Sequence, residues 1–136
     1  MKNFFVVFDT NVIVSALLTT HPESPTATLL NMVLDETITP LYNEEIISEY
    51  RDVLSRKKFG FSKQQINRVM AAIQKGISIG RTHSDFEFPD PDDAVFYEVT
   101  LSKEESYLVT GNVKHFPRVD KVVLPAELLS IILCQE

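Results

Sequence analysis

The segment Phe4-Phe5-Val6-Val7-Phe8-Asp9-Thr10-Asn11-Val12 decides the fold class of this chain. Its first five residues are apolar and three of them are aromatic, which is typical of a strand buried on both faces in a parallel sheet. An aspartate directly after such a strand stands at the edge where open α/β folds bind their ligands. Asp9 also has a simpler interpretation, because aspartate is favoured as the cap of a following helix. The segment therefore predicts a parallel α/β fold and leaves both roles of Asp9 open.

Length and composition predict one ordinary globular domain over residues 1–136. Of the 136 residues, 44% are hydrophobic and 24% are charged, which is enough for one well-filled core. No apolar run reaches the roughly 20 residues that cross a bilayer, and Met1-Lys2-Asn3 enters the first strand without a signal-peptide pattern. The single cysteine, Cys134, excludes an internal disulfide and a multi-cysteine metal site. We therefore expect a cytoplasmic protein that needs no membrane.

Charge is distributed unevenly along the chain. The net charge of −6 argues against a nucleic-acid partner. Residues 51–81, however, hold eight basic side chains against Asp52 alone, a local charge of +7 that leaves the remainder at −13. This segment is either a solvated helical surface or a basic flank for a polyanion beside an acidic centre. The basic residues are Arg51, Arg56, Lys57, Lys58, Lys63, Arg68, Lys75 and Arg81.

Helix and strand patterns alternate along most of the chain, as in a parallel sheet with helices on both faces. Prolines 22 and 25 break the first helical stretch in two, and Pro40 weakens the second strand pattern. Ser62 and Gln65 fit a capping box. The predicted strands are 4–8, 37–41, 77–82, 107–110 and 122–124, and the predicted helices are 12–19, 26–35, 44–57, 63–76, 93–101 and 125–133.

Glu49 is the acid of its predicted helix that should be partly buried. It lies beside an apolar stripe formed by Ile46, Tyr50, Val53 and Leu54 and falls at the border of that stripe. A carboxylate buried alone is costly or becomes protonated, so a partner is expected. The alternative is that Glu49 reaches water from the edge of the stripe or pairs with a lysine.

The densest group of acids is Pro89-Asp90-Pro91-Asp92-Asp93-Ala94. The macrodipole stabilises one acid at a helix N-terminus by about 0.3–1 kcal/mol, so one of the three is explained as a cap. Three acids this close repel one another, and a divalent cation would remove that repulsion. The apolar residues 94–97 follow directly, which indicates that the helix begins at the core with its acidic end in a cleft.

Asn112 follows the predicted strand 107–110 and, like Asp9, stands just beyond a carboxyl end of the sheet. Gly111-Asn112 is also common turn chemistry. A doubly wound fold could bring Asp9, Glu49, Asp93 and Asn112 to one side. Oxygen ligands of this kind suit Mg²⁺ or Mn²⁺, and such an ion suits phosphodiester hydrolysis because it can activate water and stabilise charge on a phosphate.

These residues resemble those of a PIN domain, in the prokaryotic group of toxin components of toxin–antitoxin pairs. The resemblance spans nearly the whole chain and implies a three-layer α/β/α sandwich with a mostly parallel sheet and a metal-dependent ribonuclease site. It also implies an RNA substrate, a homodimer and a separate antitoxin protein. The matching segments are Val7-Phe8-Asp9-Thr10-Asn11-Val12, Ile47-Ser48-Glu49-Tyr50-Arg51, Asp90-Pro91-Asp92-Asp93 and Leu108-Val109-Thr110-Gly111-Asn112.

By matching position, the resemblance makes Asp9, Glu49 and Asp93 the principal catalytic and metal-binding acids, with Asp92 as the alternative third acid. Many PIN domains carry aspartate where Asn112 stands. Asparagine can still coordinate a cation through its carbonyl oxygen but brings no charge, so one firmly bound ion is expected, and two-metal catalysis is in doubt.

The same resemblance suggests supporting roles around the acids. Asn11, Thr110 and Asp90 would orient the ligands or the phosphate. The candidates for contacts with the RNA backbone are Arg51, Lys114, His115 and Arg118.

Two other functions are considered. A degenerate PIN domain could bind RNA or protein without cutting, and Asn112 supports that alternative. An aspartyl phosphohydrolase of the haloacid-dehalogenase kind would use Asp9 as nucleophile, but it needs acids at the positions of Asn11 and of Gly111-Asn112.

Overall fold

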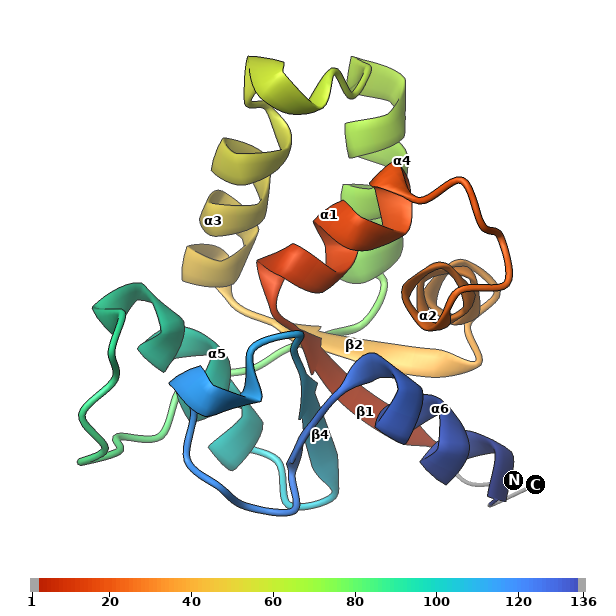
Figure 1. Cartoon of the computed structure of the whole chain (residues 1–136). Coiled ribbons are helices and arrows are strands. Elements are labelled where there is room, and N and C mark those ends of the chain that lie inside the picture. Colours follow the sequence, from red (N-terminus) through yellow and green to blue (C-terminus); the bar gives the residue numbers. More distant parts are fainter. Residues whose placement is uncertain (1–2, 135–136) are drawn as a thin grey trace.

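The computed structural model describes residues 3–134 and shows five parallel strands in one sheet. The strand order is β3-β2-β1-β4-β5, with the buried strand of the opening segment at the centre (Figure 1). The predicted α/β class with a parallel sheet is confirmed. The strands are β1 (Phe4–Phe8), β2 (Ile38–Tyr42), β3 (Ile77–Ser78), β4 (Ser106–Val109) and β5 (Val122–Val123).

Helices cover both faces of the sheet. Helix α5 packs against β1, β2 and β4, whereas α2 and α4 pack against β2 and α6 packs against β4. None of the helices in the described residues is long and apolar enough to cross a membrane. The helices are α1 (Thr10–Leu18), α2 (Pro25–Leu34), α3 (Glu44–Leu54), α4 (Lys63–Gln74), α5 (Ala94–Leu101) and α6 (Pro125–Cys134), with short 3₁₀ turns η1 (Lys57–Phe59), η2 (Pro91–Asp93) and η3 (Val113–His115).

Strand β1 is hydrophobic on both faces because it lies between two other strands and under helices on each side. Val6 and Val7 point to opposite faces and are both fully buried. The neighbouring strand β2 forms despite Pro40, which stands opposite Val6. Gly76, at the end of α4, lies against this proline: a Cβ there would sit 2.0 Å from the Pro40 carbonyl oxygen, so the position requires glycine.

The order of the strands creates a topological switch point between β1 and β4. The chain leaves β1 toward β2 and leaves β4 toward β5, so the connections that follow these two strands run in opposite directions. Open parallel sheets bind their ligands at such a switch point. Phe8 is paired with Val109, and Asp9 and Thr110 therefore emerge side by side at this edge.

Several element boundaries differ from the sequence-based expectation. The helix predicted to run to about residue 57 ends at Leu54, and the next turn is the 3₁₀ segment η1. The predicted strand 77–82 ends at Ser78, because the Thr82 N–H donates to the carbonyl oxygen of Glu98 on α5 and draws the chain away from the sheet. The predicted helix 93–101 begins as the 3₁₀ turn η2.

On α3 the predicted apolar stripe is correct except at one position. Ile46, Tyr50 and Leu54 are buried, as expected. Val53 is half-buried, and Ile47 takes its place among the buried residues. The capping box predicted for Ser62 and Gln65 is present at the start of α4.

Candidate active site

Asp9 occupies the N-cap position of α1, but its side chain makes no capping hydrogen bond. The carboxylate is turned instead toward β4, where the Thr110 hydroxyl donates to Asp9 Oδ2 over 2.7 Å. The Asn11 amide donates to the same oxygen over 3.2 Å. Asp9 is 6% exposed. The simple cap interpretation therefore does not describe this side chain.

Two loops are joined around Asp9 by a short chain of hydrogen bonds. The backbone N–H of Asn112 donates to Thr110 Oγ1 over 3.0 Å. The backbone N–H of Gly111 donates to Asn11 Oδ1 over 3.3 Å. Thr110 and Asn11, which were expected to orient the site, thus hold one edge of the Asp9 carboxylate. Burial raises the pKa of Asp9, and the Thr110 hydrogen bond opposes part of that rise.

Glu49 approaches the same edge from α3. The helix is fixed there by Tyr50, whose buried hydroxyl donates to the carbonyl oxygen of Phe8 at the end of β1. Glu49 itself is half-buried, as its place beside the apolar stripe predicts. Burial raises its pKa, and the negative charges of Asp92, Asp52 and Asp9 add to the effect while Arg56 opposes it.

Asp93 lies at the start of α5 with 15% of its side chain exposed. Its pKa is raised to about 6 by burial and then by the negative charges of Asp9 and Asp90. His115 Nδ1 lies 3.5 Å from Asp93 Oδ2 and opposes this rise. Asp9, Glu49 and Asp93 are called the three-acid cluster below, because the charge of Asp9 acts on both of the other acids and the three come from separate elements.

The other acids of the Asp90–Asp93 segment have different surroundings. Asp92 is exposed, and its negative charge acts on Glu49. Asp90 is also exposed, and its Oδ1 accepts the backbone N–H of Asp92 over 3.0 Å, so Asp90 caps η2. One of the three acids is therefore a cap, as expected from the sequence.

Asn112 contributes to the site through its backbone. Its side chain is exposed, and as the N-cap of η3 it makes no capping hydrogen bond. The backbone N–H bonded to Thr110 fixes the turn that follows β4. The suggested role of Asn112 as a metal ligand through its side chain remains a prediction.

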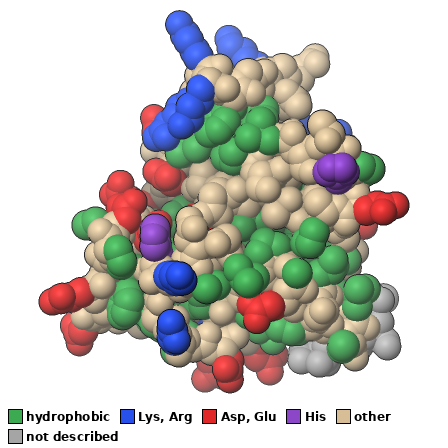
Figure 2. Space-filling model, in the orientation of Figure 1, with side chains coloured by type: hydrophobic (Ala, Val, Ile, Leu, Met, Phe, Trp, Pro, Cys, Tyr) green, Lys and Arg blue, Asp and Glu red, His purple; other side chains and the backbone are tan. Residues whose placement is uncertain are grey.

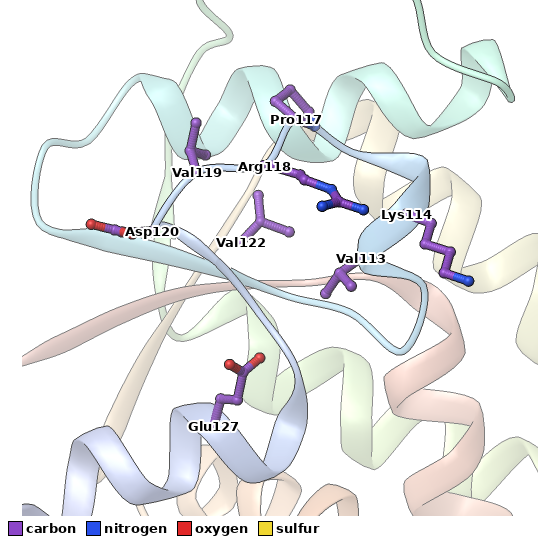
Figure 3. Close-up of a pocket in the computed structure, with 8 residues that line it drawn as sticks. All are labelled: Val113, Lys114, Pro117, Arg118, Val119, Asp120, Val122 and Glu127. Carbon is purple, nitrogen blue, oxygen red and sulfur yellow. The ribbon is translucent and has the colours of Figure 1, made fainter.

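The basic residues suggested as RNA contacts fall in three places. Arg51 is exposed on α3, and His115 is beside Asp93. Lys114 and Arg118 line a separate pocket of about 360 Å³, in which Arg118 extends toward Val113 (Figure 3). None of the three-acid cluster lines this pocket. The remaining lining residues are Pro117, Val119, Asp120, Val122 and Glu127.

The donor set of the cluster suits a hard divalent cation. Within residues 3–134, no three His, Cys, Asp or Glu side chains converge closely enough to enclose an ion by themselves. Mg²⁺ does not need such a cage, because it commonly keeps several waters and binds one or two carboxylates directly. The hydroxyl of Thr10, next to Asp9, is buried without a hydrogen-bond partner in this part of the chain, so a polar group near Asp9 is still unsatisfied.

Two residues of this region were not anticipated as part of it. Thr10 was expected only as a neighbour of Asp9 in the motif, and Tyr50 only as a member of the apolar stripe. Their signals were present in the sequence: a hydroxyl follows the buried strand directly, and a tyrosine follows Glu49 on the buried side. A buried tyrosine hydroxyl usually finds a partner, and here that partner positions Glu49.

A parallel sheet with acidic side chains at its switch point is typical of the α/β proteins that bind ligands at this edge. Comparison with family models identifies which family this is: a model described as PIN domain matches residues 5–114. The chain belongs to the PIN domain family. PIN domains are generally nucleases, which places the chain in a nuclease superfamily and decides against the haloacid-dehalogenase alternative. Comparisons with curated proteins and with solved structures gave no match.

Proposed function

We propose that this chain is a Mg²⁺- or Mn²⁺-dependent endoribonuclease that hydrolyses RNA phosphodiester bonds. The observation that supports this best is the state of the three-acid cluster. The pKa values of Asp9, Glu49 and Asp93 are all raised, although His115 and Arg56 act on them. Burial, together with repulsion from neighbouring acids at Glu49 and Asp93, thus exceeds what the protein's own cations supply, and a bound divalent cation would offset it.

In this proposal Asp9 and Asp93 hold the ion, and Glu49 holds a water or acts as general base. The ion, when bound, would activate water and stabilise negative charge on the phosphate. Thr110 and Asn11 fix the orientation of Asp9 through hydrogen bonds to Oδ2. Glu49 has a raised pKa, which brings a carboxylate closer to the range in which it can accept a proton near neutral pH.

Cleavage of a labelled RNA in the presence of Mg²⁺ or Mn²⁺ tests the proposed activity. We expect cleavage by the wild-type chain, none in excess chelator, and none by Asp9→Asn. Asp85→Asn is the matched control, because Asp85 is an almost fully exposed acid outside the cluster. Cleavage that survives both the chelator and Asp9→Asn would contradict the mechanism. Metal-independent RNA binding without any cleavage would instead favour the degenerate, binding-only alternative that Asn112 suggests.

The biological setting proposed for this activity is a toxin–antitoxin pair in the cytoplasm, with a homodimeric nuclease held inactive by an antitoxin protein. The decisive observations are growth arrest on expression, its loss in Asp9→Asn, and the presence of a short DNA-binding reading frame beside the gene. Normal growth on expression, with no such neighbouring frame, would contradict it.

A further inference from the structure

We propose that residues 56–63, which join α3 to α4 and are called the basic tip below, bind the phosphate backbone of single-stranded RNA and guide it toward the three-acid cluster. This proposal rests on the ribonuclease function proposed above and adds a site to it. The tip lies at the far end of α3 from the sheet, at the top of the molecule in Figure 1.

The basic tip carries positive charge that the rest of the protein does not neutralise. Lys57, Lys58 and Lys63 are exposed, and none of them forms an ion pair within residues 3–134. Only Arg56 has an acidic partner, Asp52, in an exposed pair of 3.2 Å. Figure 2 shows the lysine and arginine side chains gathered at this end, with acidic side chains lower on the same face.

Arg81, at the other end of the basic segment, does not belong to this surface. Its guanidinium is paired with Glu45 over 2.7 Å and with Glu98 over 2.8 Å. The excess charge of residues 51–81 is therefore available mainly along α3, η1 and α4.

The basic tip is held in one shape rather than being a loose loop. The rings of Phe59 and Phe61 stack with centroids 5.6 Å apart. Gly60 ends η1 in the left-handed conformation with φ of 69°, which favours glycine. The capping box of Ser62 and Gln65 then starts α4. A surface that is already ordered loses less entropy when it binds a ligand.

The position of the tip also fits a substrate path. Glu49 lies on α3, and the tip begins two residues after Leu54, the last residue of that helix. Leu54 lies about 8 Å along the helix axis from Glu49 at the usual rise per residue. A strand held at the tip thus needs only a few nucleotides to reach the cluster. The residues outside 51–81 carry a charge of −13, which repels the phosphates of RNA. Binding at the basic tip would offset this repulsion.

Charge decides the choice of occupant. An array of lysines without acidic partners attracts a polyanion through counterion release, and the order of the tip suits an extended single strand. The alternative occupant is the acidic surface of a second copy of this chain, and the experiment below distinguishes the two.

The test measures binding without cleavage. A fluorescent oligouridine is titrated with full-length Asp9→Asn protein in chelator at about 0.1 M salt, and Lys57, Lys58 and Lys63 are then all changed to Glu in that background. We expect affinity to fall by tenfold or more. The slope of log affinity against log salt should become shallower by about 2, as three single-strand phosphate contacts would give.

Two single variants provide the matched comparison. Lys58→Glu and Lys75→Glu both reverse one exposed lysine of the basic segment, but Lys75 lies at the opposite end of α4. Lys58→Glu should weaken binding several-fold and Lys75→Glu by less than twofold. Equal losses in the two variants would mean that net charge alone matters, and would overturn the proposal.

The outcomes separate this proposal from the function on which it rests. If the wild-type chain cleaves RNA and the triple variant still binds as tightly, the tip proposal is wrong and the ribonuclease proposal stands. If the triple variant changes only the sedimentation of the protein, the tip is a contact between copies, and the proposal is also wrong. If the wild-type chain neither binds nor cleaves RNA, both proposals fail.

Discussion

At the scale of single residues, the orientation of Asp9 depends on a contact between two segments that lie far apart in the sequence. Thr110 is fully buried and lies 101 positions after Asp9 in the sequence, and its hydroxyl gives the shorter of the two side-chain hydrogen bonds to Oδ2. Groups that orient a metal ligand are commonly worth 10- to 100-fold in metal affinity or activity, as an order of magnitude. In the proposed metal site we therefore expect Thr110 to act as a positioning residue with a measurable effect.

Thr110→Val should reduce Mn²⁺ affinity and cleavage by about 10- to 100-fold, since valine keeps the shape but loses the donor to Asp9. Titration of Mn²⁺ by calorimetry and the cleavage rate give the two readouts. Thr100→Val is the matched control, because Thr100 is equally buried but bonds the Phe96 carbonyl oxygen within α5 over 2.8 Å. That control should lose about 1 kcal/mol of stability and keep its metal affinity. Equal losses of metal affinity in both variants would contradict the positioning role.

Asp93 should make the metal-free protein sensitive to pH. Its folded-state pKa is raised from 3.8 to about 6, so the folded protein holds this proton more tightly than the unfolded chain does. Stability is then greatest below pH 3.8 as far as this group is concerned and is lost as pH rises toward and beyond 6.

In chelator, Asp93→Asn should therefore increase the free energy of unfolding by about 1–3 kcal/mol at pH 7.5 and change it little near pH 3.5. Urea denaturation at the two pH values measures this. Asp92→Asn is the control, since Asp92 is exposed, and its effect should be much smaller. A gain of the same size at both pH values would show that ionisation of Asp93 is not the cause.

At the scale of elements, an ion-pair network built on the buried Glu98 fixes the segment that leads from β3 to the acids. Glu98 on α5 is 7% exposed and binds the Arg81 guanidinium over 2.8 Å and the backbone N–H of Ser84 over 3.1 Å. Arg81 also bonds Glu45 on α3 over 2.7 Å. The network ties this connection to two helices that carry members of the three-acid cluster.

Arg81→Met should destabilise the protein by about 1–3 kcal/mol, because it leaves the Glu98 carboxylate buried without a charged partner. Glu45→Gln should cost less than about 1 kcal/mol, because Glu45 is exposed and its pair with Arg81 is screened by water. Thermal or urea denaturation of the three proteins tests the difference. Similar effects of both substitutions would mean that the network does not depend on the burial of Glu98.

The same network explains why one predicted element was too long. Residues 77–82 have the composition of a strand. The hydrogen-bond partners of Arg81 and Thr82, however, lie on α5 and α3, and no neighbouring residue in the sequence indicates these distant contacts. By contrast, the helix starts at Asn43 and Ser62 depend on contacts within three residues, so the sequence was sufficient to predict them. Local signals were reliable, and signals that required distant partners were not.

At the scale of the whole molecule, metal binding and folding should be coupled. The cluster is unfavourable without a cation, since burial raises all three pKa values and nearby acids raise those of Glu49 and Asp93 further. A ligand that binds only the folded state stabilises it by about 2.7 kcal/mol at 100 times its dissociation constant. For a chain of 136 residues, this corresponds to a rise in Tm of about 10 °C.

Saturating Mn²⁺ should therefore raise the Tm of the wild-type protein by about that amount at pH 7.5, as measured by scanning calorimetry. In Asp9→Asn the rise should be small, which also controls for general screening of the net charge of −6. An equal rise in both proteins would attribute the effect to screening and would contradict a cation site at Asp9.

The site could be predicted from the sequence only in part, because it too depends on contacts between residues that are distant in the sequence. The alternation of strands and helices predicts that Asp9 and Asn112 reach the same edge of the sheet. It does not predict that Asn112 contributes its backbone and leaves its side chain exposed, because that turn is fixed by the Thr110 hydroxyl, which is itself oriented by Asp9 on the neighbouring strand end. Nor does it distinguish a capping Asp90 from a half-buried Asp93.

The two outer strands of the sheet have a consequence for assembly. Strands β3 and β5 have only two residues each, so either border of the sheet offers few backbone groups to which another chain could add a strand. Partners that lengthen a sheet need such a border. Any stable association of this protein must therefore be made by side chains on its helices and loops, and it can be altered by surface substitutions that leave the sheet intact.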